Sequence, residues 1–181
     1  MEETVLLEKQ GAIATLFMNR PSSYNAIDKD LAESLADKLI SLRFDSEIRS
    51  IILTGQCKAF CAGGDLKWAL NHELGYSAGL YKLATLYHNA IVEIRNMPKP
   101  VIAAINGPAA GGGFSLALVC DLRVMSESAQ LRQVYTSNGL SIDGGGSFTL
   151  PRLVGHAKAM EIMAFDEPIS AEKAYDWGLV T

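Results

Sequence analysis

Residues 99–113, KPVIAAINGPAAGGG, continue into the apolar segment FSLALVC, and this stretch carries the most information about the fold. Residues 101–120 contain no charged side chain, and this length of uncharged chain must be weighed as a membrane span. Asn106, Pro108 and three consecutive glycines interrupt it, however. Such residues divide the stretch into a short strand, a glycine turn and a short apolar helix. The sequence therefore favours buried α/β structure over a membrane helix.

Strands and helices alternate on both sides of this stretch. Asp28 stands where it would cap a helix whose leucines recur every three or four residues, and Pro98 ends a second, longer amphipathic pattern. Such alternation predicts one layered α/β domain. The expected elements are a hairpin at 4–7 and 12–18, helices at 28–45 and 78–96, strands at 49–54, 100–105 and 122–125, a helix from the triple glycine to about 119, and mostly helix from 145 onward.

Composition excludes several classes of function. The 181 residues are 49% hydrophobic and 20% charged, which are the proportions of an ordinary globular domain. A net charge of −4 without any basic run argues against a nucleic-acid partner. Three cysteines without a C-x-x-C pair indicate reduced thiols of a cytoplasmic protein. The three histidines lie far apart in the sequence, so no metal site is expected.

Glycine is distributed unevenly. Eight of the sixteen glycines lie in three clusters, at 63–64, 111–113 and 144–146. Glycine allows a ligand to approach backbone N–H groups closely, or permits a positive φ. Residues 107–113 lack both the G-x-G-x-x-G spacing and the Lys-Ser/Thr of a P-loop. We therefore expect no nicotinamide or nucleotide cofactor.

Two chemistries remain open for the glycine loops. Residues 113–117, GFSLA, miss the nucleophile motif G-x-S-x-G by one residue, and Ser115, His156 and Asp166 would form a hydrolase triad in the usual chain order. Ser115 is otherwise a small helix residue. Alternatively, amides from two glycine loops converge on one oxygen as an oxyanion hole, in which each donor contributes about 3 kcal/mol to a transition state. The helix dipole would strengthen the donor at Gly112.

Two blocks of the sequence form a recognisable pattern. The first is Leu53-Thr54-Gly55 with residues 59–66 (AFCAGGDL), and the second is residues 99–107 with Gly111-Gly112-Gly113. Together they closely resemble the crotonase (enoyl-CoA hydratase/isomerase) superfamily. Residues 18–21 (MNRP) and 150–155 (LPRLVG) extend the likeness along the chain. The resemblance implies an α/β spiral of ββα turns with flanking helices, coenzyme A thioester substrates and homotrimers or hexamers. Family members usually continue beyond the position of Thr181, so residues 1–181 are expected to be a core domain lacking the C-terminal helical region.

The resemblance also implies roles for individual residues. The amides of Gly64 and Gly112 would hold the thioester oxygen. Asp65 is interpreted as a helix cap or a tie within the loop. Four residues fall where the family contacts the adenine and phosphates of the coenzyme: Tyr24, Ala26, Ala62 and Lys67. Of these only Lys67 has a side chain suited to phosphate, and it is equally well read as an ordinary exposed lysine.

Departures from the family pattern decide the expected chemistry. Hydratases of the family use two glutamates, and this chain has Ser115 and Tyr135 at those positions, so water addition by that pair is expected to fail. Asp143 matches the working carboxylate of isomerases related to phenylacetate breakdown, and the nucleophile of 4-chlorobenzoyl-CoA dehalogenase. That dehalogenase has a histidine where His88 falls but a tryptophan where Tyr135 stands. We interpret His88 as packing rather than catalysis, and Asp143 either as a working carboxylate or as a helix cap.

The sequence therefore predicts an acyl-CoA enzyme, most specifically an enoyl-CoA double-bond isomerase of fatty acid metabolism with Asp143 as the proton shuttle. Tyr135 and His88 are assigned to the substrate pocket. A hydratase-like lyase reaction, a dehalogenase-like reaction, and a non-catalytic protein that binds CoA thioesters remain as alternatives. Coenzyme A would enter as part of the substrate, with no separate cofactor.

Overall fold

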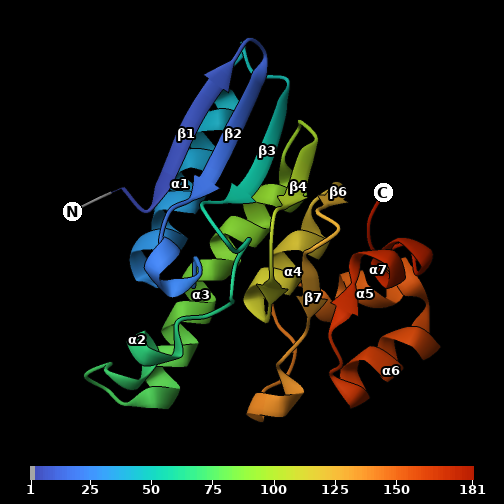
Figure 1. The fold of residues 1–181 in the computed structure, drawn as a ribbon. Helices are drawn as coiled ribbons and strands as arrows, with labels where there is room; N and C mark the ends of the chain where they lie inside the picture. The colour runs from blue at the N-terminus through green and yellow to red at the C-terminus, as the bar shows by residue number, and fades with distance from the viewer. Residues whose placement is uncertain (1–2) are drawn as a thin grey trace.

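The structure is a computed structural model, and it describes residues 3–181. Its main layer is a five-stranded sheet with the order β1-β2-β3-β4-β6 (Figure 1). β1 and β2 form the expected antiparallel hairpin, and the other neighbours pair in parallel. Parallel neighbours require crossover connections, which the helices supply. The strands are β1 Val5–Gln10, β2 Ile13–Met18, β3 Ser50–Gly55, β4 Val101–Ile105 and β6 Leu122–Met125.

Two long helices, α1 (Lys29–Phe44) and α3 (Tyr76–Asn96), pack against each other and cover one face of this sheet (Figure 1). The leucines of α1 are buried because they recur at helical spacing on one face. Asp28 caps α1 by accepting a hydrogen bond from the Leu31 amide at 2.9 Å. Both helices therefore confirm the ranges expected from the sequence to within two residues.

A second, smaller layer consists of β5 (Ala109–Ala110), β7 (Gln130–Arg132) and β8 (Ile169–Ser170). Single parallel bridges join Cys61 to Ala109 and Ile27 to Gly64. Successive turns of the chain thus give a strand to the large sheet, a second extended segment to the smaller layer, and then a helix. This is the spiral of ββα turns that the sequence resemblance implied.

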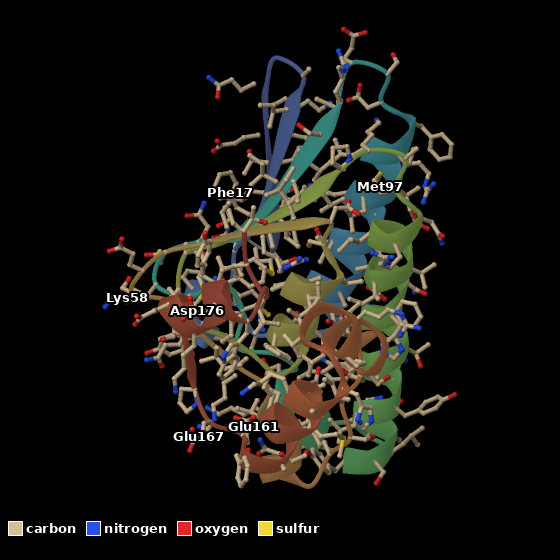
Figure 2. All side chains as sticks on the ribbon, turned by 90° about the vertical axis from the view of Figure 1, so that its right-hand side faces the viewer. Phe17, Lys58, Met97, Glu161, Glu167 and Asp176 are labelled. Carbon is tan, nitrogen blue, oxygen red and sulfur yellow. The ribbon has the colours of Figure 1, made fainter. Side chains whose placement is uncertain are left out.

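Helix α4 (Gly112–Val119) lies at the centre of the molecule, and all eight of its residues are buried. The uncharged stretch at residues 101–120 thus folds as β4, β5 and α4. No helix within residues 3–181 has the length and apolarity needed to cross a membrane. Three helices follow in the C-terminal part of the chain, with Glu161 and Asp176 marking two of them in Figure 2. They are α5 (Gly146–Val154), α6 (His156–Phe165) and α7 (Ala171–Asp176).

Helix α2 (Leu66–Leu70) is a short element that the sequence pattern did not reveal. Five residues are too few to show a helical period. Asp65 begins the helix, because its side chain accepts hydrogen bonds from the amides of Lys67 and Trp68, each at 3.1 Å. The interpretation of Asp65 as a helix cap is confirmed.

Gly113 fixes how closely α4 approaches the preceding strand segment. A Cβ built at Gly113 would lie 2.1 Å from the Cys61 carbonyl oxygen, so Gly113→Ala must push backbone apart. We expect this substitution to lower the melting temperature by roughly 5–10 °C, as overpacking of a core does. The matched control is Gly112→Ala, whose nearest contact lies at 3.5 Å, an ordinary van der Waals distance. Equal melting temperatures for the two variants in a calorimetric scan would contradict this account.

Candidate active site

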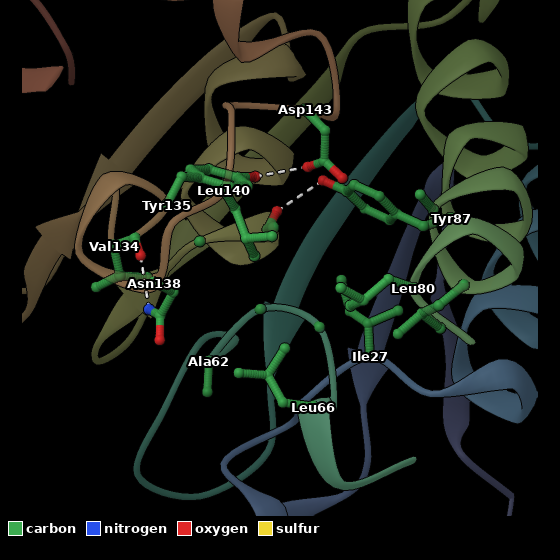
Figure 3. A pocket seen from close by; sticks show the side chains of 16 residues that line it. Ile27, Ala62, Leu66, Leu80, Tyr87, Val134, Tyr135, Asn138, Leu140 and Asp143 are labelled. Carbon is green, nitrogen blue, oxygen red and sulfur yellow. Dashed lines mark hydrogen bonds between the residues drawn. The ribbon is translucent and has the colours of Figure 1, made fainter. Parts of the chain in front are cut away.

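A cavity of about 150 Å³ lies between α3, the start of α4 and the loops that carry residues 62–66 and 134–143 (Figure 3). The sequence analysis assigned nine residues to catalysis or substrate binding, and five of them line this cavity although they come from segments far apart in the chain: Ala62, Gly64, Gly112, Tyr135 and Asp143. The remaining four of the nine, Tyr24, Ala26, Lys67 and His88, are not part of its lining.

The Gly64 amide is turned away from the neighbouring segment by the geometry of a parallel bridge. The amide of Ile27 donates to the Gly63 carbonyl at 2.7 Å, and the amide of Asp65 donates to the Ile27 carbonyl at 2.8 Å. In a parallel ladder the residue between the bonded carbonyl of Gly63 and the bonded amide of Asp65 points its own N–H to the other side. Gly64 is that residue, and it lines the cavity.

The Gly112 amide lies beside that of Gly64. Gly112 is the first residue of α4, where amides have no partner within the helix. A Cβ built at Gly112 would lie only 3.6 Å from the Gly64 nitrogen. Neither amide donates a hydrogen bond to any residue within 3–181. The two donors can therefore serve one bound oxygen.

Tyr87 of α3 supports this arrangement, and the sequence analysis did not assign it to the site. Its hydroxyl donates to the Gly112 carbonyl oxygen at 2.6 Å. Burial raises the pKa of Tyr87 well above its ordinary value, so the phenol keeps its proton and remains a donor. The position of Tyr87 on the apolar face of α3 was visible in the sequence, but its contact with a residue 25 positions away was not.

The carboxylate of Asp143 is held by a phenol. The Tyr135 hydroxyl donates to Asp143 Oδ1 at 2.7 Å, and the Ser115 hydroxyl lies 2.9 Å from that of Tyr135 (Figure 3 labels Tyr135 and Asp143). The N-cap position of α5 is Gly145, with no side-chain cap. The alternative interpretation of Asp143 as the cap of that helix is therefore wrong, because the carboxylate is turned toward Tyr135.

The hydrolase triad considered in the sequence analysis is not formed. Ser115 is fully buried with Tyr135 as its side-chain partner. Asp166 accepts a hydrogen bond from the Val134 amide at 2.8 Å and another from the Ser137 hydroxyl, while His156 is exposed at the start of α6. Each of the three residues has a separate place in the fold, so Ser115 lacks a base.

His88 ties the Asp143 loop to α3. Its Nε2 accepts a hydrogen bond from the Gly144 amide at 3.1 Å and lies 4.0 Å from Asp143 Oδ2. The side chain is 45% exposed. Such a contact orients the loop without placing the imidazole in the cavity wall.

The residues that the resemblance assigned to the coenzyme lie on two loops at the cavity and in the first turn of α2. Tyr24 is exposed, and its carbonyl accepts a hydrogen bond from the Ala62 amide at 3.0 Å. Ala26 is buried, and Lys67 is exposed on α2. Arg20 joins the two loops through ion pairs to Asp28 at 3.0 Å and to Asp65 at 3.1 Å.

The walls of the cavity are mostly apolar, and sequence reasoning missed them. They come from helices and loops whose contacts no local pattern reveals: Ile27, Leu66, Leu80, Leu83, Ala84, Val134 and Leu140. Within residues 3–181, no three His, Cys, Asp or Glu side chains gather as a metal site would require.

The sequence of the chain is similar to those of known proteins of one family. The family model described as enoyl-CoA hydratase/isomerase matches residues 8–181. A 4-chlorobenzoyl coenzyme A dehalogenase of Arthrobacter sp. is 35% identical over 97% of this chain and 64% of its own length. The 1,2-epoxyphenylacetyl-CoA isomerase of Escherichia coli K12 is 35% identical over 99% of this chain and 69% of its own length. The chain thus spans about two thirds of these relatives.

A solved structure shows the same fold. It is a Thermobifida fusca YX protein assigned to the enoyl-CoA hydratases and crystallised with acetoacetyl-CoA. The TM-score is 0.87 at 28% identity, and the match covers 98% of this chain and 72% of the other. On these grounds the chain belongs to the enoyl-CoA hydratase/isomerase family.

Proposed function

We propose that this protein shifts the double bond of enoyl-CoA thioesters, with Asp143 as the only proton-transferring side chain. The observation that carries the proposal is the composition of one cavity. Two amides without an internal partner, those of Gly64 and Gly112, share it with a single carboxylate. An oxyanion hole and one base are sufficient for moving a proton between carbons beside a thioester.

In the first step the thioester oxygen accepts hydrogen bonds from both amides. Asp143 removes a proton from the carbon between the carbonyl and the double bond of a 3-enoyl-CoA. The electron pair of the broken C–H bond is delocalised onto the thioester oxygen as a dienolate. Each amide contributes about 3 kcal/mol to this charged state because it is already oriented before the reaction. The Tyr87 hydroxyl supports that orientation through the Gly112 carbonyl.

In the second step the protonated Asp143 returns the proton to the γ carbon, which gives the conjugated 2-enoyl-CoA and restores the carboxylate. The apolar side chains of Leu80, Leu83 and Leu140 keep the dienolate away from water, which would otherwise supply protons to it. The small volume of the cavity suits the acyl carbons, and the coenzyme would extend over the adjoining loops.

The coenzyme site is proposed from the resemblance and supported by its position. Tyr24, Ala26 and Ala62 lie on two loops joined by the Ala62–Tyr24 hydrogen bond and by Arg20. Lys67 lies on α2, which follows the second of these loops. The Thermobifida relative was crystallised with acetoacetyl-CoA. We also propose a homotrimer or hexamer as the assembly, which light scattering measures.

Dehalogenation is the second candidate. It is favoured by the 4.0 Å separation of His88 and Asp143 and by the likeness to the Arthrobacter dehalogenase. Asp143 would then attack a chlorinated aryl carbon as a nucleophile, the C–Cl bond would break with release of chloride, and water would hydrolyse the resulting aryl ester to a phenol and the free carboxylate. Hydration is less well supported, because Ser115 and Tyr135 offer no second carboxylate at the site. A protein that only binds CoA thioesters would turn over none of these substrates.

The Asp143→Asn variant tests the proton shuttle. An amide of equal size accepts no proton near neutral pH, so we expect isomerisation to fall by about 10²–10⁴-fold. Affinity for a CoA thioester should stay within about threefold. Chromatography of 3-enoyl-CoA reaction mixtures, and calorimetry for binding, measure the two quantities. Parallel assays with 2-enoyl-CoA and 4-chlorobenzoyl-CoA separate isomerase from hydratase and dehalogenase. Wild-type activity in Asp143→Asn would eliminate the assignment.

The Gly112→Ala variant tests the paired amides. The added methyl would lie 3.6 Å from the Gly64 nitrogen, in the space that the thioester oxygen must enter. Because the nearest contact of that methyl is an ordinary one, the fold should persist while kcat falls by about 10²-fold or more. Steady-state kinetics measure the fall in kcat, and a melting curve shows whether the fold persists. Unimpaired turnover would place the oxygen elsewhere.

The Lys67→Ala variant tests the coenzyme contact. Loss of one exposed cation near a phosphate should raise KM about three- to tenfold with little change in kcat, and the effect should shrink as salt is added. The matched control is Lys173→Ala, an exposed lysine on α7, which lies at the opposite side of the molecule from α2 (Figure 1). Equal KM values for the two variants would show that Lys67 is only a solvated side chain.

A further inference from the structure

Three oxygen atoms form a continuous chain of hydrogen bonds at one wall of the cavity. Ser115 Oγ lies 2.9 Å from the Tyr135 hydroxyl, which lies 2.7 Å from Asp143 Oδ1. Ser115 is fully buried and Tyr135 is 6% exposed. Two neutral hydroxyls thus stand behind the carboxylate to which the proposed reaction assigns proton transfer.

The chemistry of the three groups fixes the direction of each bond. An ionised carboxylate only accepts hydrogen bonds, and a phenol has a single proton to give. Tyr135 therefore donates to Asp143, and the Ser115 hydroxyl must donate to the Tyr135 oxygen. Burial and the nearby charge of Asp143 both raise the pKa of Tyr135 above its ordinary value, so the phenol retains its proton.

The two carboxylate oxygens are consequently unequal. Oδ1 is held by Tyr135, whereas Oδ2 accepts no hydrogen bond from the described part of the chain. His88 faces Oδ2 from α3, with its Nε2 4.0 Å away, and this nitrogen already accepts from the Gly144 amide. Tyr87 is the other titratable group of α3 that faces Asp143, and its hydroxyl is directed to the Gly112 carbonyl.

We propose that Tyr135, itself oriented by Ser115, is a positioning residue that anchors Oδ1 of Asp143 and leaves Oδ2 as the atom that takes and returns the proton. The inference rests on the proposed function of Asp143. When a substrate proton resides on Oδ2, Oδ1 is the carbonyl oxygen of the acid and still accepts from Tyr135. The anchor therefore lasts through both steps, and neither hydroxyl gains or loses a proton.

The test is the dependence of kcat/KM on pH for 3-enoyl-CoA. Activity needs ionised Asp143, so the acidic limb of the profile follows the protonation of that carboxylate. Tyr135→Phe removes the hydrogen bond that the ionised carboxylate accepts, and the limb should therefore move to higher pH by about one unit. Ser115→Ala should move the limb in the same direction by less, because the bond between Tyr135 and Asp143 remains.

The matched control is Tyr87→Phe, which also removes one buried phenol oxygen from this cavity. It should lower kcat through the oxyanion site without moving the acidic limb, because Tyr87 bonds to the Gly112 carbonyl. General damage to the fold would lower activity at every pH alike. An unmoved limb in Tyr135→Phe, or an equal shift in Tyr87→Phe, would overturn the inference.

A measurement without turnover separates this inference from the proposed function. Carbon NMR titration of aspartate-labelled protein, with Asp143→Asn used to assign the signal, reports the pKa of Asp143 directly. A higher value in Tyr135→Phe than in the wild type supports the anchor even if no enoyl-CoA is converted. Equal values contradict it even if the wild type is an active isomerase. Ser115→Ala supplies the same comparison should Tyr135→Phe fail to fold.

Discussion

The site depends on one steric constraint, the close approach of the loop carrying Gly63 and Gly64 to the first turn of α4. A Cβ built at Gly63 would lie 2.7 Å from the Ala110 carbonyl oxygen and 2.9 Å from the Gly112 nitrogen. Only glycine permits that spacing, and the spacing makes the amides of Gly64 and Gly112 neighbours. Amides left without partners at such a position are costly unless a ligand or water accepts from them. The proposed donation of these two amides to a substrate oxygen depends on this placement.

Two buried phenols orient the two halves of the site. Tyr87 bonds to the peptide carbonyl of Gly112, and Tyr135 bonds to Asp143. Both phenols are buried, and a hydrogen bond to a carbonyl or carboxylate is worth more there than in water. Burial also keeps both phenols protonated. The Gly112 carbonyl and the Asp143 carboxylate are thus each hydrogen-bonded to a buried aromatic side chain.

The ββα spiral explains why residues so distant in sequence meet at one cavity. Each turn places its second extended segment beside that of the previous turn, as the bridges from Ile27 to Gly64 and from Cys61 to Ala109 show. The loops that follow these segments therefore emerge side by side. Family members sharing this frame carry names for different reactions, such as dehalogenase and epoxyphenylacetyl-CoA isomerase, so the side chains around the paired amides must select the chemistry.

Elements with strong periodicity or clear end signals could be predicted from the amino-acid sequence alone. The spacing of the leucines in α1, the cap at Asp28 and the proline after α3 are local features, and the structure confirms them. The glycine clusters and the family motifs also pointed to Gly64, Gly112 and Asp143 before any contact was known. The partners of their side chains and backbone groups, in contrast, became visible only in the three-dimensional fold. Tyr87 to Gly112 spans 25 positions and Ser115 to Tyr135 spans 20, and hydrogen bonds over such distances follow from helix packing that no local pattern encodes.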